Sequence, residues 1–384
     1  MAKPLPITAQ QVQSVVEHVF GEPLHAKQVE SVANAALGVI HSAALNIHAI
    51  GAGMAGSRGV QPRHAVKQVD RLLSNHKICM WSLFAQWVPF VVGARQEIFG
   101  VLDWTDFDDD DQTTIALHML TSHGRATPLM WSTVKKSDLK ERRNEFEDDL
   151  LERFKKVVPK DVKVTVMADR GFGDQKLYQL LTELGFDYII RFRDIITVTD
   201  EQGESRPAAE WVPANSRALM LKNAQVTQDR YRVPAVVVVK DSGMKEPWCL
   251  ATSRATDSAR EIVKYYGKRF TIEESFRDGK DLHFGMGLSW THISNCMRRD
   301  RLLLLSALAI VLLTILGAAG EQIGLDRWLK VNTVKRRTHS LFRQGQMYYA
   351  LLPKMKEPNA TQLVERFGQL VAEQPHCCEI LGII

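Results

Sequence analysis

The sequence predicts an α/β protein in which a sheet-forming middle lies between helical regions at the two ends. Apolar residues recur at helical spacing up to about residue 88. Beyond that point, short β-branched runs alternate with charged amphipathic stretches, as at 98–102 and 137–158. With 384 residues, 45% of them hydrophobic, the chain is long enough for one large core and smaller units beside it.

The first segment, residues 1–88, is expected to be a helical DNA-binding region, and the alternative is a plain helical cap on the core. Val12, Val15, Val16 and Val19 fall at helical spacing. Dense glycines at 51–59 predict a break between two helical pieces. Basic residues follow this break: Arg63, His64, Lys67, Arg71 and Lys77.

Residues 89–194 are expected to form the first part of the core. The expected elements are strands at 98–102, 113–120 and 126–134, a helix at 137–158, a strand at 162–167 and a helix at 174–184. Three strands in series predict an antiparallel meander. The segment 195–254 is rich in β-branched residues and turns, so it is expected to interrupt the core as a β-rich insertion domain.

The core resumes at 255–325, and the C-terminal region, 326–384, follows it. A helix is expected from Ser258 to about Lys280, because Ser258 and Glu261 have the spacing of a capping box. Residues 302–320 are almost free of polar side chains. This segment has the composition of a membrane span, but a helix buried on all sides of a large core has the same composition, and we favour the core helix.

Charge and cysteine content narrow the class of protein. The net charge is +5, and basic residues gather in runs at 298–301 and 335–337, which favours a polyanionic partner but also fits solvated surface. The five cysteines lack paired CxxC spacing, which argues against a zinc site and fits a reducing cytoplasm. The first residues lack a secretory pattern, so we expect a cytoplasmic protein without a membrane anchor.

One polar stripe stands out on the expected helix. Tyr266, Arg269, Glu273 and Lys280 fall within an arc of roughly 60° if the helix is regular. An acid flanked by two cations and a phenol is poorly explained as core. The alternative is an exposed face with an ordinary i,i+4 ion pair between Arg269 and Glu273.

Two aspartates upstream favour a catalytic interpretation of this stripe. Asp103 follows the apolar run 98–102, and Asp169 follows 162–168, so each is expected at the carboxyl end of a strand. Phosphodiester hydrolysis and transfer commonly use two divalent ions held by carboxylates, and Mg²⁺ prefers oxygen ligands. Asp103, Asp169 and Glu273 are therefore the candidate metal ligands and catalytic residues. Rival acids are Asp106, Asp108, Asp109, Asp110, Asp111 and Glu274, which lie in a polar turn or off the stripe.

These motifs resemble a known family. The spacing Y-x2-R-x3-E-x6-K resembles the signature of the transposases of insertion-sequence family four, a cut-and-paste group. The segments starting at Asp103-Trp104-Thr105 and Asp169-Arg170-Gly171 resemble the first and second acidic motifs of that family. Residues 67–75 and 337–345 resemble its terminal regions, so the likeness spans most of the chain.

The resemblance implies a fold, cofactors and partners. It implies a ribonuclease-H-like catalytic core, interrupted by the insertion domain, that binds two Mg²⁺ ions, with Mn²⁺ as a substitute. The expected substrate is double-stranded DNA, namely the terminal inverted repeats of the element and the target, bound by a homodimer with 326–384 as a contact surface. The reaction would be cleavage through a hairpin, then joining.

It also implies roles for four side chains at the DNA. Tyr266, Arg269 and Lys280 would contact phosphates, and Trp248 would stack on a flipped base, although a tryptophan packed against a sheet is the common alternative. Three other functions stay open on the sequence: a catalytically silent DNA-binding descendant, a related nuclease that cuts without joining, and a membrane-associated protein built around 302–320.

Overall fold

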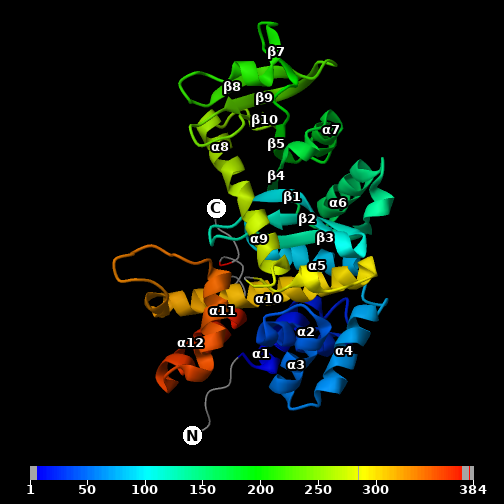
Figure 1. Ribbon diagram of the computed structural model, residues 1–384, viewed down its shortest axis with the longest axis vertical. Helices are drawn as coiled ribbons and strands as arrows, with labels where there is room; N and C mark the ends of the chain where they lie inside the picture. Colours follow the sequence, from blue (N-terminus) through cyan, green and yellow to red (C-terminus); the bar gives the residue numbers. More distant parts are fainter. Residues whose placement is uncertain (1–6, 284, 374–379, 381–384) are drawn as a thin grey trace.

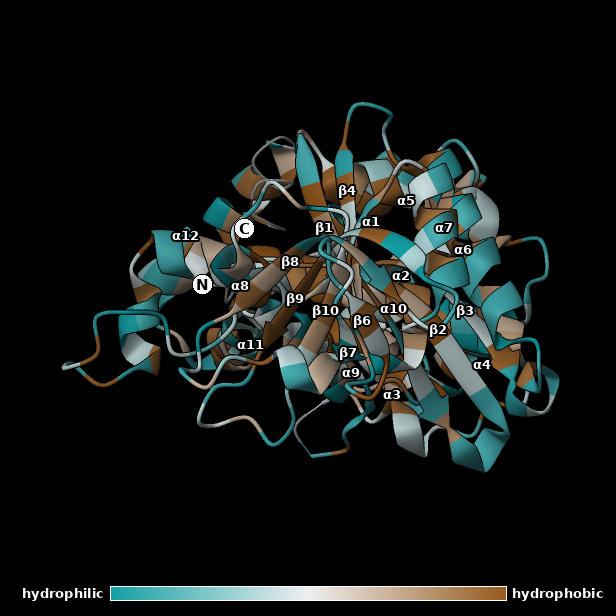
Figure 2. Cartoon of the chain, turned by 90° about the horizontal axis from the view of Figure 1, so that it is seen from above, coloured by the Kyte–Doolittle hydropathy of each residue, from teal (hydrophilic) through white to brown (hydrophobic). Residues whose placement is uncertain are grey.

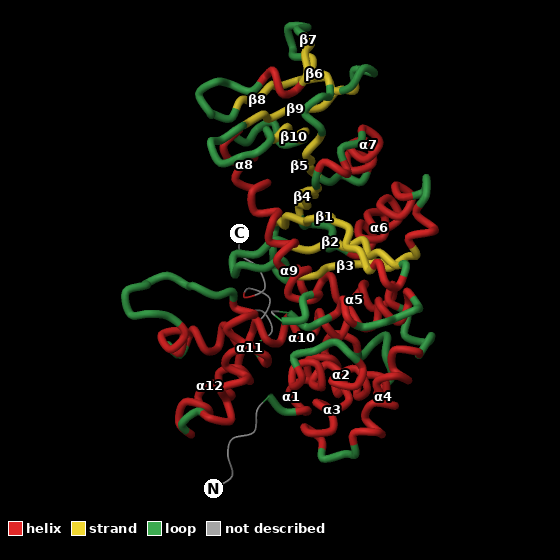
Figure 3. Tube along the Cα trace, in the orientation of Figure 1, coloured by secondary structure: helices red, strands yellow, loops and turns green. Residues whose placement is uncertain are grey.

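The structure is a computed structural model that describes residues 7–283, 285–373 and 380. Helices gather at one end of the molecule and a long twisted sheet rises away from them (Figure 1). The same division is clear when the trace is coloured by secondary structure (Figure 3). The sequence interpretations that rest on the first four residues, and on Cys377 and Cys378, lie outside the described residues.

The N-terminal region is helical throughout its described part, as predicted. Its helices are α1 (Ala9–Phe20), α2 (Ala26–Ser42), α3 (Ile47–Arg58), α4 (Pro62–Ser74) and α5 (Met80–Val92). The break predicted among the glycines occurs at Gly59, but Gly51 and Gly53 lie inside α3. A Cβ atom on Gly51 would lie 2.5 Å from Cγ2 of Val66 in α4, and one on Gly53 would lie 2.6 Å from the Gly38 carbonyl oxygen in α2. These glycines therefore allow close helix packing, which local sequence does not reveal.

The core sheet begins with the predicted meander. β1 (Glu97–Phe107), β2 (Gln112–Met119) and β3 (Thr127–Lys135) pair antiparallel. β4 (Lys163–Ala168) lies parallel to β1, and β5 (Asp187–Phe192) lies parallel to β4. The connecting helices are α6 (Arg143–Val157) and α7 (Gln175–Glu183). α6 starts six residues later than predicted, because a 3₁₀ turn at Lys136–Leu139 precedes it.

The β-rich segment continues this sheet. Its strands are β6 (Thr197–Thr199), β7 (Ser205–Pro207), β8 (Leu219–Val226), β9 (Tyr231–Val239) and β10 (Trp248–Thr252). The order in space is β3-β2-β1-β4-β5-β10-β9-β8-β6-β7, a single ten-stranded sheet. β10 pairs antiparallel with β5, for example Leu250 with Arg191. The insertion is thus hydrogen-bonded to the core edge to edge, and its boundaries as a domain stay a prediction.

The chain then returns to the core along two helices that follow one another. α8 (Ala259–Gly267) starts at the predicted capping box, in which the Ser258 side chain accepts a hydrogen bond from the Glu261 backbone N–H and the Glu261 side chain accepts from the Ser258 N–H. A 3₁₀ turn, η5 (Lys268–Phe270), separates α8 from α9 (Thr271–Lys280). The expected single regular helix is therefore tightened in its middle.

The apolar segment 302–320 forms most of α10 (Cys296–Gln322), which has the length and hydropathy of a membrane span. However, 89% of its most apolar window is buried inside the protein, as expected for a core helix. Hydrophobic residues gather in the interior around α10 and the central strands (Figure 2). α11 (Leu341–Leu351) and α12 (Glu357–Ala372) pack beside it and complete the helical end.

Candidate active site

The pairing of two parallel strands brings Asp103 and Asp169 together. In the β1–β4 pair, Leu102 lies opposite Ala168, and the residue that follows each of them is an aspartate. Side chains alternate between the faces of a sheet. Asp103 therefore points to the same face as Val101, which is the face that α8 and α9 cover.

The prediction that both aspartates end strands is right for one of them. β4 ends at Ala168, and Asp169 caps the following 3₁₀ turn through a hydrogen bond to Gly171 N–H of 2.8 Å. β1 runs on to Phe107, because its partner β2 pairs with it throughout, with Asp103 opposite Ala116. Asp103 still marks the place where the parallel pairing with β4 stops.

Arg269 joins the third carboxylate to the first. It lies in the η5 turn with only 6% of its surface exposed. Its Nη2 donates to Glu273 Oε1 at 2.8 Å, and its Nη1 donates to Asp103 Oδ2 at 3.3 Å. Glu273 itself, in the first turn of α9, is about half exposed. The i,i+4 ion pair between Arg269 and Glu273 is present, but it does not lie on an exposed helix face, because Arg269 is buried and also contacts Asp103 in β1.

The carboxylates form one electrostatic group. The pKa of Asp103 is raised to about 6, mainly by burial; Arg269 opposes this rise, and the negative charges of Asp169 and Glu273 add to it. Burial lowers the pKa of Arg269, but the nearby Tyr266 and the same three carboxylates outweigh this effect and raise it. A cation is therefore strongly favoured at this position.

The donor set has the chemistry of a magnesium site, but its arrangement is that of an arginine-neutralised cluster. Three carboxylates from two strands and a helix are the hard oxygen donors that Mg²⁺ prefers. Among residues 7–283, 285–373 and 380, no three acidic, histidine or cysteine side chains form a ready metal-binding group. The guanidinium of Arg269 contacts two of the three carboxylates, so a divalent ion would have to displace it.

An open groove of about 670 Å³ passes Asp103 and Glu273. Lys280 lines it, and its Nζ donates to Thr105 Oγ1 at 3.1 Å and to the Asp106 carbonyl oxygen at 2.6 Å. Burial lowers the pKa of Lys280, which reflects the cost of holding an ammonium group there. The stripe residues Arg269, Glu273 and Lys280 thus lie along one side of the two aspartates.

Tyr266, the fourth member of the stripe, packs into the core. It is 1% exposed, and burial raises its pKa to about 12. Trp248 of β10 contacts it edge-on, with ring centroids 5.0 Å apart, and lies 6.0 Å from the ring of Phe270. Phe270 is 43% exposed, an aromatic residue that sequence reasoning missed because nothing in the local pattern separates it from the apolar docking face.

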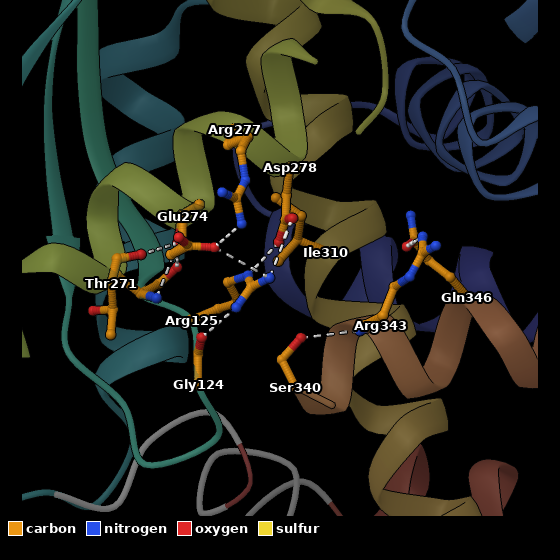
Figure 4. Close-up of polar contacts among 12 residues, drawn as sticks. Gly124, Arg125, Thr271, Glu274, Arg277, Asp278, Ile310, Ser340, Arg343 and Gln346 are labelled. Atoms are coloured by element: carbon orange, nitrogen blue, oxygen red, sulfur yellow. Dashed lines mark hydrogen bonds and ion pairs between the residues drawn. The ribbon is translucent and has the colours of Figure 1, made fainter. Parts of the chain in front are cut away.

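The rival acids have structural partners. Asp106 and Asp108 form ion pairs with Lys136, and Asp110 pairs with the buried Arg299. Asp109 and Asp111 belong to the same turn after β1. Glu274 is not among the residues that line the groove, and it forms ion pairs with Arg277 and Arg125 (Figure 4).

This outer set of contacts also fastens the helix that carries Glu273. Arg125, in the loop between β2 and β3, pairs with Asp278 of α9 (Figure 4). Nearby, Ser275 Oγ accepts from Ala126 N–H at 3.0 Å. α9 is therefore fixed to the same meander that carries Asp103.

One of the two basic runs faces inward. Arg299 is fully buried against Asp110 and Gln112, and Arg301 donates to the carbonyl oxygens of Leu73 and Ile78. The suggestion that residues 298–301 meet a polyanion, or are plain solvated surface, is wrong for these two side chains. In the second run, Lys335 and Arg336 are exposed.

Comparison with known families gives one match. Residues 100–312 match the family described as the transposase DDE domain. The match begins in β1 and ends in α10, so it includes Asp103, Asp169 and Glu273. No curated protein matches the chain.

Proposed function

This chain belongs to the transposases with a DDE domain, and we propose that it cuts and joins the ends of a bacterial insertion sequence of family four. Its core would be ribonuclease-H-like, formed by 89–194 and 255–325 and interrupted by 195–254. A meander followed by two parallel strands, with helices packed against it, supports this core. The observation that carries the proposal is the β1–β4 register, which sets Asp103 beside Asp169.

Asp103, Asp169 and Glu273 are the residues we assign to metal binding and catalysis. Two Mg²⁺ ions, or Mn²⁺ in their place, would activate the attacking oxygen and stabilise the leaving oxygen when bound. Arg269 neutralises Asp103 and Glu273, and metal ions bound there would take over that role. Its guanidinium would then be available for a phosphate, which it can contact through two N–H groups.

Lys280 and the aromatic residues position the DNA. Lys280 is held by Thr105 and Asp106 at the groove, where its ammonium group can contact a phosphate without reading sequence. Tyr266 acts through packing, because its ring supports Trp248. Trp248, with the exposed Phe270 beside it, would hold a base flipped out of the duplex.

In the proposed reaction, one set of carboxylates serves every step on DNA. Water cleaves a phosphodiester at the element end and frees a 3′-hydroxyl. That hydroxyl attacks the opposite strand, which closes a hairpin and releases flanking DNA. After water reopens the hairpin, the 3′-hydroxyl attacks target DNA. Two ends must be joined together, so we propose a homodimer on the terminal inverted repeats, with 326–384 as a contact surface and 1–88 binding DNA.

Cleavage of plasmid DNA carrying the element ends tests this proposal. In Mg²⁺, Glu273→Gln should lower the cleavage rate roughly a thousandfold, because several kcal/mol of metal-assisted stabilisation are lost. Glu274→Gln is the matched control, because Glu274 is the next acidic residue of α9, does not line the groove and pairs with Arg277 and Arg125. This variant should cleave like the wild type. Equal cleavage by Glu273→Gln and wild type would refute the assignment.

Two related functions are separated by further readouts of the same assay. A catalytically silent DNA-binding descendant would bind the ends but leave every strand intact. A nuclease that cuts without joining would produce breaks but no products in which element ends are linked to target DNA. The matched family and the three carboxylates favour the complete reaction.

A further inference from the structure

We propose that Trp290 is a second stacking platform of the active-site groove and binds an unpaired DNA base at the α9 C-terminal end. The proposal rests on the proposed function, since it concerns how the same groove holds its DNA. It adds a recognition element that the acidic residues and the stripe do not supply.

The first observation is exposure at the groove. Trp290 is 69% exposed, and Leu282 nearby is 50% exposed. Both line the groove that contains Asp103 and Glu273. Large apolar side chains left in water beside a polar cleft often mark a binding surface.

The second observation is that the exposed indole belongs to a structured turn. Trp290 ends η6 (Leu288–Trp290), and its backbone N–H donates to the Gly287 carbonyl oxygen at 3.0 Å. Leu288 is buried, and the Thr291 hydroxyl donates to its carbonyl oxygen at 2.6 Å. The anchored turn holds the ring at the groove, so less conformational entropy is lost on binding.

The charges of the groove identify the occupant. Arg277, Lys280 and His283 line it together with the acidic residues, a combination suited to phosphates near a metal-dependent site. Within a duplex the base faces are stacked and closed to an indole. An unpaired base exposes its π-face, and stacking on an aromatic side chain is tolerant of sequence. The occupant we assign is therefore an unpaired base next to the strand being cut.

Trp290 is distinct from the Trp248 site. Trp248 lies on β10 and contacts Tyr266 and Phe270, at the point where α8 leads into α9. Trp290 follows the other end of α9 and shares the groove with Lys280. The two aromatic sites thus flank Glu273 along the helix, which would hold bases on both sides of the reacting phosphate.

A binding experiment tests the proposal without catalysis. The full chain is titrated, in EDTA and at fixed salt, with a short duplex ending in an unpaired strand that carries 2-aminopurine. A blunt duplex of the same length is the second probe. Trp290→Ala should weaken binding of the unpaired probe roughly 5- to 150-fold, and the 2-aminopurine should regain fluorescence. Binding of the blunt duplex should change less than about twofold, and Trp290→Phe should keep most of the affinity.

The control is Ile195→Ala, which shortens a similarly exposed apolar side chain (72%) in the loop after β5 that does not line the groove. It should bind both probes like the wild type. Unchanged affinity of Trp290→Ala for the unpaired probe, or equal loss for both probes, overturns the proposal. If Trp290→Ala sediments as a smaller species than the wild type and binds both probes unchanged, Trp290 forms a contact between two copies of the chain. That result also overturns the proposal. Plasmid cleavage by wild type and Glu273→Gln is run in parallel, so failure of the proposed function is recognised separately.

Discussion

Replacement of Arg269 by alanine should destabilise the protein in metal-free buffer and make its stability depend on divalent cations. Arg269 is buried between Asp103 and Glu273, and among the described residues no other cation forms an ion pair with either carboxylate. Without it, Asp103 and Glu273 keep their mutual repulsion, and the buried Asp103 loses its counter-ion. A bound cation should restore most of the lost stability.

The magnitude follows from the contact with Asp103. At 3.3 Å and an effective dielectric constant of about 20, the attraction between the two charges is about 5 kcal/mol. Part of it is offset, because the variant no longer buries a guanidinium group. Removal of one partner from a buried pair usually costs about 3–5 kcal/mol, and the half-exposed Glu273 adds little. We therefore expect a loss of about 3 kcal/mol in the free energy of unfolding.

Urea unfolding in EDTA and in excess MgCl₂ measures this effect. A ligand present at a hundred times its Kd adds about 2.7 kcal/mol to the stability of the state that binds it. Mg²⁺ should raise the midpoint of Arg269→Ala more than that of the wild type, because no guanidinium has to be displaced. Arg277→Ala removes an exposed ion pair of the same helix and should cost less than about 1 kcal/mol. An Arg269→Ala midpoint equal to that of the wild type in EDTA would refute the reasoning.

Two further predictions concern the packing around α10. Burial raises the pKa of Asp300 to about 7, from 3.8 unfolded, so this carboxyl group lowers wild-type stability as pH rises from about 4 to 7. The Asn side chain of Asp300→Asn can still accept a hydrogen bond from Thr133 N–H. The stability of this variant relative to the wild type should therefore grow over that pH range, by at most about 4 kcal/mol. A difference between the urea midpoints of variant and wild type that is the same at pH 5 and pH 8 would contradict this. A Cβ on Gly345 would lie 1.8 Å from the Leu313 carbonyl oxygen, so Gly345→Ala should lower the unfolding free energy by about 3 kcal/mol. Gly56→Ala in α3, where a Cβ meets nothing within 4 Å, should instead stabilise slightly, and similar melting curves for both variants would refute the packing argument.

The order of the core elements and the location of the second aspartate, Asp169, could be predicted from the sequence. Val164 and Val166 alternate up to Asp169, and β4 ends there as that pattern predicts. The end of β1 could not be predicted in the same way. Polar residues follow Asp103, so the local sequence does not show that the strand continues. Only the pairing with β2 shows that these residues remain in β1.

The stripe on α8 and α9 was predicted from ideal helix geometry, which assumes about 100° per residue throughout. The 3₁₀ turn at Lys268–Phe270 advances faster, at three residues per turn, so the residues before and after it are rotated relative to one another. Tyr266 consequently packs against the sheet, while Arg269 turns toward Asp103. Such a turn has no clear local signal, because it depends on how both helices dock.

Burial of Arg299 and Arg301, in the first turns of α10, is a long-range property. Arg299 contacts Asp110, 189 positions earlier, and its fate could not be read from the arginines around it. The cations next to Arg299 in the sequence describe only the local charge. The acid that neutralises Arg299 is Asp110, which the fold of the β1–β2–β3 meander places beside it. The acidic turn after β1 therefore has a structural role through Asp110.

The continuous sheet has a consequence for any shortened form of the chain. Because β10 pairs with one edge of β5 and β4 with the other, excision of the segment from β6 to β10 would leave the N–H and C=O groups of β5 that face β10 without partners. An unprotected strand of this kind recruits strands from other molecules. A truncated protein should thus precipitate or assemble into larger species instead of yielding a trimmed, well-behaved core.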